Sequence, residues 1–203
     1  MDMTFGYYGK LPFAGDFLRH GLSAAFVSGW DAWMQRVLLM ASETEGETRW
    51  QSLYLCAPIW RFSIAPGRLA SHGAVGVLMP SLDRVGRRFP FCIAAATDLP
   101  PVAAYLALQP VAERLEAIAL DMIEGEGGLS TLDARLAQLP SLSPLQHVAG
   151  LGQGVGSLWI ATVMDQARVM LAPHVPTRPD EAAALFNPDA SYWTHAALTG
   201  SET

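Results

Sequence analysis

Seven charged side chains are the residues of this chain that could do chemistry. All seven stand among apolar residues, in the segments GYYGKLPFAGDF, APIWRF and PSLDRVGRRFP. They are Lys10, Asp16, Arg61, Asp83, Arg84, Arg87 and Arg88. Such a set can form a structural ion network, a recognition patch for a partner, or a clamp for an anion. No nucleophile or general base accompanies the cations, so the sequence predicts no catalytic residue.

The three interpretations make different demands on the same side chains. In a network, Asp83 caps a turn and the arginines bind Asp16 and backbone carbonyls. In a patch, at least one of Arg87 and Arg88 is exposed, because neighbours in an extended segment face opposite ways. An anion clamp would make the protein a small hydrolase built on Lys10, Arg84, Arg87 and Arg88. The residues alone leave these alternatives open.

Lys10 is the only lysine, since arginine supplies every other basic side chain. An ammonium is a compact point charge, whereas a guanidinium needs room for a planar fork. The tight segment between Gly9 and Pro12 therefore favours lysine.

Familiar cofactor and nucleophile motifs are incomplete. A phosphate-binding loop ending at Lys10 would need glycine where Thr4 stands and a hydroxyl where Leu11 stands. Ser157 is followed by Leu158, not by the small residue of a hydrolase elbow. The five histidines are not at metal-ligand spacing. The sequence therefore predicts no cofactor and no metal.

Two tryptophans mark the elements that would position the charges. The spacing of apolar residues over 23–43 predicts a helix with Ser23 as its cap and Trp30 on its buried face. Residues 52–67 read as a strand with Trp60 facing the core. Both tryptophans are expected to be buried, and Cys56 and Cys92 are expected to be small core residues.

The other elements follow from apolar runs and breakers. Strands are predicted within 73–80 and 89–97, on either side of the polar loop SLDRVGRR. Helices are predicted over 111–124 after Pro110, over 130–139 with Ser130 as cap, and near 180–186. A strand in the second half of 150–163 continues into a hairpin that turns at Asp165 and Gln166. This mixture favours a sheet with helices on both faces.

Length and charge limit the class of protein. The 203 residues fit one domain, and the net charge is −6. Residues 1–100 carry nine basic and eight acidic side chains, whereas residues 101–203 carry four and eleven. This balance argues against nucleic acid as the main partner. Neither a membrane-spanning apolar run nor a secretory signal is present, so we expect a cytoplasmic protein without membrane insertion.

Five ordered segments together resemble the type VI secretion-associated family known as TagF or ImpM. They are GYYGKLPFAGDF, WDAWMQ, APIWRF, GVLMPSLDRVGRRFPF and, more weakly, GSLWIA. The resemblance is strong over residues 1–100 and general beyond them. We therefore expect one domain over residues 1–203, with a less regular tail over 174–203. The expected fold is α/β, a three-layer α/β/α sandwich with a mixed, largely antiparallel sheet.

The resemblance also implies a function. It implies a cytoplasmic accessory protein that represses assembly or firing of the type VI secretion system after translation. We expect this protein to be non-enzymatic, because the sequence contains no complete catalytic constellation. The implied partner is the forkhead-associated scaffold protein of that system. The small anion-binding hydrolase described above and a purely structural component of the secretion baseplate remain as alternatives.

Overall fold

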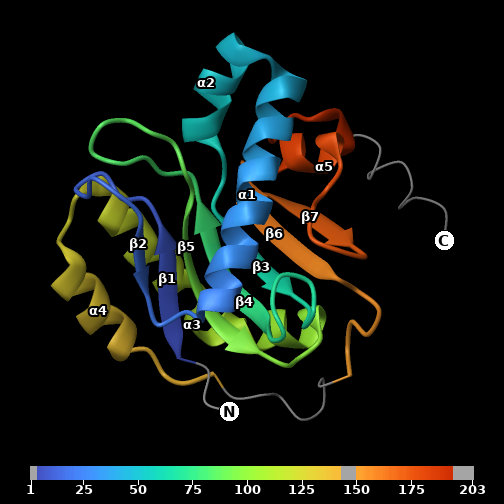
Figure 1. Cartoon of the computed structure of the whole chain (residues 1–203). Coiled ribbons are helices and arrows are strands. Elements are labelled where there is room, and N and C mark those ends of the chain that lie inside the picture. Colours follow the sequence, from blue (N-terminus) through green and yellow to red (C-terminus); the bar gives the residue numbers. More distant parts are fainter. Residues whose placement is uncertain (1–3, 143–149, 194–203) are drawn as a thin grey trace.

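A seven-stranded sheet organises the protein (Figure 1). The computed structural model describes residues 4–142 and 150–193. The strand order is β2-β1-β5-β4-β3-β6-β7, and every pairing is antiparallel. The strands are β1 (Phe5–Gly9), β2 (Leu18–His20), β3 (Trp60–Ile64), β4 (Gly73–Met79), β5 (Phe91–Thr97), β6 (Ser157–Val163) and β7 (Gln166–Ala172).

The predicted α/β class is confirmed, and so is the largely antiparallel character of the sheet, but the expected parallel pairing is wrong. Four pairs of successive strands, β1 with β2, β3 with β4, β4 with β5, and β6 with β7, are sheet neighbours. Connections without a crossover helix join successive strands in antiparallel fashion. The long excursion between β5 and β6 also returns the chain antiparallel, beside β3.

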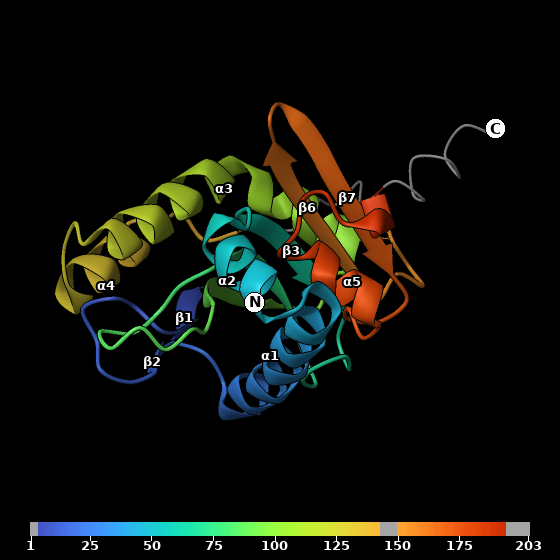
Figure 2. The same cartoon turned by 90° about the horizontal axis from the view of Figure 1, so that it is seen from above.

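Helices lie against both faces of the sheet, with α1 and α3 on opposite sides in Figure 2. The helices are α1 (Ala24–Glu45), α2 (Glu47–Cys56), α3 (Pro101–Glu124), α4 (Leu129–Ala137) and α5 (Pro179–Ala184). One core joins α1, α2 and α5 to the sheet and contains Trp30, Trp33 and Trp159. A second core joins α3 and α4 to the sheet and contains Val77 and Leu115.

The first helix and its tryptophan lie as the sequence predicts. Ser23 Oγ accepts a hydrogen bond from the backbone N–H of Phe26 at 3.2 Å, which caps α1. Trp30 is 0% exposed on α1, and Trp60 is 2% exposed on β3. The prediction that both are core residues is confirmed.

The predicted strand over 52–67 is wrong in its first half, because residues 47–56 form α2. Trp50 and Tyr54, four residues apart, are the buried residues of this helix. Helical periodicity thus places both rings in the core. Cys56 is exposed, contrary to expectation, whereas Cys92 is buried in β5. Burial raises the pKa of the Cys92 thiol, although the backbone of Tyr8 opposes this.

The third helix is longer than predicted. It begins at Pro101 and contains Pro110, which was expected to start it. The alanine- and leucine-rich turn before Pro110 has high helix propensity, and burial of this face stabilises it. The helix ends at Glu124, as predicted, and Gly125 follows it in the left-handed conformation. Ser130 is not the cap of α4, because the cap position is Gly128.

The predicted hairpin is confirmed, with its turn one residue earlier. Val163 pairs with Gln166, so Met164 and Asp165 form the turn. Their φ angles of 47° and 62° are both positive, as in the tight turns that match strand twist. The short helix predicted near 180–186 is α5.

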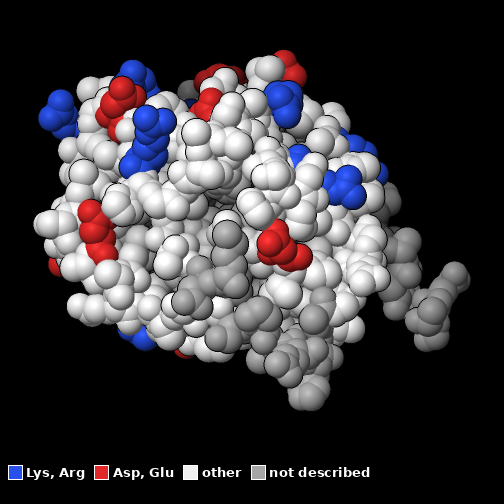
Figure 3. All heavy atoms as spheres, turned by 60° about the horizontal axis from the view of Figure 1, so that its bottom comes forward, with Lys and Arg blue, Asp and Glu red and all other residues white. Residues whose placement is uncertain are grey.

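The surface is poor in charge. On the face of Figure 3, lysine and arginine side chains are scattered, with acidic side chains nearby and uncharged surface between them. Among the described residues, no helix has both the length and the apolarity needed to span a bilayer.

The indole N–H groups of Trp30 and Trp60 provide a test of the first core. Trp60 Nε1 donates to the carbonyl of Leu185 at 2.7 Å. Trp30 Nε1 is buried without an acceptor among the described residues. We expect Trp60→Phe to destabilise the protein by about 1–3 kcal/mol more than Trp30→Phe, because it leaves a buried carbonyl unpaired. Urea denaturation of both variants measures this, and equal losses would contradict the assignment.

Candidate functional site

Two loops that are distant in sequence meet at one end of the sheet. Loop 10–17 follows β1 and loop 80–90 precedes β5. Since β1 and β5 are antiparallel neighbours, the end of one lies beside the start of the other. The backbone N–H of Arg84 donates to the carbonyl of Ala14 at 2.9 Å and joins the loops directly. We refer to residues 10–17 and 80–90 as the loop pair.

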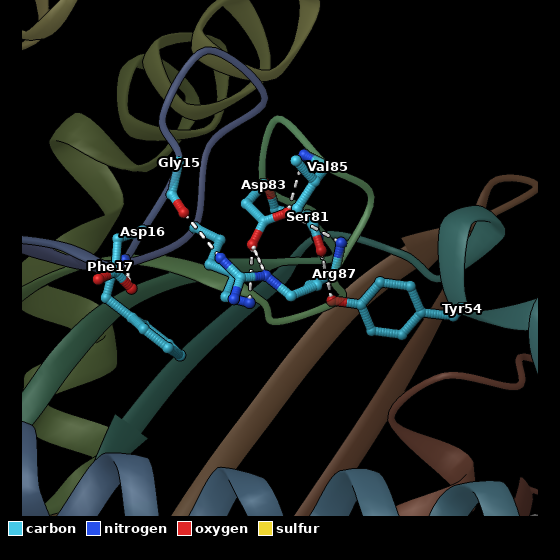
Figure 4. A network of polar contacts seen from close by, with 9 residues as sticks. Gly15, Asp16, Phe17, Tyr54, Ser81, Asp83, Val85 and Arg87 are labelled. Carbon is cyan, nitrogen blue, oxygen red and sulfur yellow. Dashed lines mark hydrogen bonds and ion pairs between the residues drawn. The ribbon is translucent and has the colours of Figure 1, made fainter.

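The carboxylate of Asp83 lies at the centre of the loop pair (Figure 4). Its side chain has 0% exposure. Oδ2 lies 3.0 Å from Lys10 Nζ and 2.6 Å from Arg87 Nε. Oδ1 accepts hydrogen bonds from the backbone N–H groups of Val85 at 3.1 Å and Arg87 at 2.9 Å. Two cations and two amides therefore satisfy one buried anion.

These contacts control the ionisation of Asp83. Burial by itself would raise the pKa of its carboxyl group, but the hydrogen bonds from the Arg87 backbone, Lys10, the Arg87 side chain and Val85 lower it. The hydrogen bonds outweigh burial and hold the pKa of Asp83 well below its usual range. The folded protein thus favours the charged form.

Lys10 owes its position to the backbone around it. Gly9 has a φ of 137°, and a Cβ there would collide with the backbone of Pro90 and Phe91. Only glycine permits this close approach of β1 to the start of β5. The Lys10 side chain is 7% exposed, and its ammonium lies 5.0 Å from the centroid of the Phe17 ring. The ring covers the cation and adds a cation–π contact.

Arg87 connects the two halves of the loop pair. Its Nη2 donates to the carbonyl of Gly15 at 2.7 Å while its Nε contacts Asp83. Figure 4 shows the guanidinium between these two residues. The rest of the side chain is exposed, so this arginine belongs both to the network and to the surface.

Asp16 lies in the loop pair but outside the network. Its carboxylate is exposed and accepts a hydrogen bond from the backbone N–H of Phe17 at 2.8 Å. The expected arginine contact to Asp16 is made instead to the neighbouring carbonyl of Gly15. Arg84 has an exposed side chain beside Gly15.

Arg61 is separate from the loop pair. It faces α3, where its Nε and Nη2 contact the two carboxylate oxygens of Glu116 at 2.6 and 2.9 Å. The hydrogen bond to Glu116 raises the pKa of Arg61, although partial burial opposes it. This bidentate pair fastens β3 to α3.

Tyr54 of α2 is a site residue that the sequence analysis missed. Its hydroxyl donates to the carbonyl of Ser81 at 2.7 Å and lies 3.2 Å from the Ser81 backbone nitrogen. The Arg88 guanidinium lies 5.8 Å from the centroid of its ring. Burial raises the pKa of Tyr54, although the Ser81 backbone and Arg88 lower it, so its hydroxyl stays protonated as a donor. The tyrosine therefore anchors the start of loop 80–90 to α2.

The arrangement suits presentation of a surface. Asp83 already pairs with Lys10 and Arg87, which were two of the four cations in the hydrolase interpretation. Within residues 4–142 and 150–193, no three histidine, cysteine or acidic side chains form a metal-binding group. Besides Asp16, Phe17 and part of Arg87, the loop pair exposes Arg84 and Val85, and Val85 is 69% exposed.

Comparisons with known proteins extend this description. Residues 6–139 match the family model for the TagF N-terminal domain, described as type VI secretion system-associated. The fold is similar to the crystal structure of PA0076 from Pseudomonas aeruginosa PAO1, with a TM-score of 0.76 and 30% sequence identity. That similarity covers 92% of this chain and 96% of the other. No curated protein matches the sequence. Both loops of the loop pair lie inside the range that the family model matches.

The depressed pKa of Asp83 leads to a pH test. Its ionised form contributes stability that is complete above the pKa of an unfolded aspartate, about 4, and is lost as pH falls towards the folded value. We expect Asp83→Asn to be less stable than the natural protein at pH 7, with the difference shrinking below about pH 4. Thermal melts from pH 7 to pH 3 measure this. Asp16→Asn is the control and should show little change, and a constant difference for Asp83→Asn would contradict the expectation.

The two neighbouring arginines should differ in their effect on stability. Arg87→Ala removes a hydrogen bond to a buried carboxylate and should cost about 1–3 kcal/mol. Arg84→Ala removes an exposed side chain and should change stability by less than about 0.5 kcal/mol. Guanidinium denaturation compares this matched pair. If both changes cost the same, Arg87 does not support the network.

Proposed function

The chain belongs to the family of TagF N-terminal domains, which are associated with the type VI secretion system, and from this premise we propose that it is a non-enzymatic cytoplasmic repressor of that system. It acts after translation by restraining assembly or firing of the secretion machine. The family match over residues 6–139 is the observation that carries the proposal. The similarity to PA0076 at 30% identity supports it.

The partner in this proposal is the forkhead-associated scaffold protein of the secretion system. The loop pair is the surface that contacts it. Arg84 and Val85 project at the tip of loop 80–90, and Phe17 is 37% exposed on loop 10–17. Arginine and aromatic side chains are enriched where proteins bind one another. The exposed groups thus combine a cation with apolar area.

The buried network supports this role through preorganisation. Asp83 holds the amides of Val85 and Arg87, so the backbone that carries the exposed tip is fixed before binding. A loop that is already ordered loses less conformational entropy when a partner binds. The network and the recognition patch are then two layers of one site, with buried groups that support exposed ones.

A three-layer arrangement is part of the same proposal. Two separate cores, one with α1 and α5 and one with α3 and α4, support helices on each face of the sheet. The loop pair lies at one end of such a sandwich, after the end of β1 and before the start of β5.

Scaffold binding should depend on Arg84 without a change in stability. We expect Arg84→Glu to weaken capture of the scaffold protein by about tenfold or more, because it reverses an exposed charge at the centre of the contact. Arg36→Glu, the same change at an exposed position on α1, is the control and should bind normally. Titration of the purified scaffold protein onto each variant measures the affinities. Undiminished binding by Arg84→Glu would show that the loop pair is not the interface. Failure of the natural protein to bind would show that the scaffold protein is not its partner.

A further inference from the structure

The two edges of the sheet are very different. β2 forms one edge with three residues, and its Arg19 and His20 are exposed. Short, charged edge strands discourage pairing with other strands. β7 forms the other edge with seven residues, Gln166–Ala172, and contains a single charged side chain, Arg168. The β7 edge thus lacks the usual protection against pairing.

The register of the β6–β7 hairpin identifies the backbone groups at this edge. A two-residue turn makes Val163 and Gln166 a hydrogen-bonded pair, and such pairs alternate along antiparallel strands. Every second residue from Gln166 therefore bonds to β6. The N–H and C=O groups of Ala167, Val169 and Leu171 point away from the sheet. Within the described residues no further strand pairs with β7.

The same three residues present apolar side chains on one face of the sheet. Val169 is 44% exposed and Leu171 is 55% exposed. They lie opposite Ile160 and Leu158 of β6. α3 packs on β3, β4, β5 and β6 at this face. The alternate residue Met170 points to the other face and is fully buried in the first core. The edge combines free backbone groups with exposed apolar area.

We propose that β7 pairs antiparallel with β7 of a second copy of this chain, on a two-fold axis through Val169. Antiparallel pairing of identical strands satisfies a two-fold axis directly, because residues equally far from the axis on opposite sides of it face each other across the two strands. Ala167 then lies opposite the partner's Leu171, and each Val169 lies opposite the other. Small and large side chains are matched, and the outward N–H and C=O groups of all three residues are paired.

Charge and strand length select this register. An axis through Arg168 would place the two Arg168 side chains directly opposite each other, and like charges in that position are destabilising. An axis through Met170 would move Ala167 opposite Pro173, which has no N–H to donate. The axis through Val169 avoids both costs, since Arg168 lies opposite the partner's Met170.

A cysteine test distinguishes this register from chance contact. Opposing residues in a hydrogen-bonded antiparallel pair have Cα atoms about 5.5 Å apart, which suits a disulfide. In a Cys56→Ser background, which removes the exposed free thiol, we expect Val169→Cys to give a covalent dimer under mild oxidation. Ala167→Cys, on the same strand and face, is the matched control. Residue 167 lies opposite residue 171 of the second copy, so the two introduced cysteines are four residues apart along the paired strands and cannot form a disulfide. Equal cross-linking of the two variants would mean random collision and overturn the proposal.

The oligomeric state of the protein tests the same interface without cross-linking. Sedimentation equilibrium of the natural chain should show a concentration-dependent mass approaching two copies. Val169→Lys should be monomeric, because two ammonium groups would meet at the axis, whereas Leu39→Lys, the same change at an exposed apolar residue of α1, should still dimerise. Circular dichroism checks that both variants are folded. A natural chain that stays monomeric at hundreds of micromolar overturns the proposal. Hydrogen exchange with and without the scaffold protein shows whether that protein pairs with β7 instead, and protection of β7 only when the scaffold protein is added also overturns the proposal.

Discussion

The carboxylate of Asp83 has no exposed surface, so its charge must be balanced by groups that fold around it. Water cannot solvate it, and burial of an unpaired charge is among the most costly events in folding. Lys10, Arg87 and two backbone amides meet this requirement. They come from both loops, so each loop has its observed form only when the other is present. The geometry of this end of the sheet depends on that single anion.

The helices and strands that were predicted correctly have a regular pattern of apolar residues along most of their length. The stripe through Trp30 fixes α1, and the apolar runs at 73–79 and 91–97 fix β4 and β5. The segment with Tyr54 was misassigned because a short apolar run fits a strand as well as a helix. Pro110 was taken as a helix start, although nine residues before it already favour helix. Burial against the sheet decides whether such a segment forms a helix or a strand, and the local sequence pattern does not show which residues will be buried.

The sequence identified the residues of the charged site better than it identified which of them contact one another. Lys10, Asp83 and Arg87 are brought together, as a network requires. Asp16 was expected to be an arginine partner, yet the hydrogen bond from Arg87 goes to the neighbouring carbonyl of Gly15. Arg61 belongs to another ion pair on α3. Only the adjacency of β1 and β5 determines which loops meet, and strand order in a sheet is not encoded by spacing along the chain.

Arg87 and the carbonyl of Gly15 are 72 positions apart in the chain. The exposed tip of loop 80–90 is therefore a discontinuous epitope, whose shape depends on a distant segment. A linear synthetic peptide copied from residues 80–90 has neither the lysine nor the carbonyl that hold its backbone, so water would solvate its aspartate and the turn would open. A useful mimic needs covalent closure or a grafted scaffold. For the same reason, antibodies raised against such a peptide would report unfolding of the domain better than its native surface.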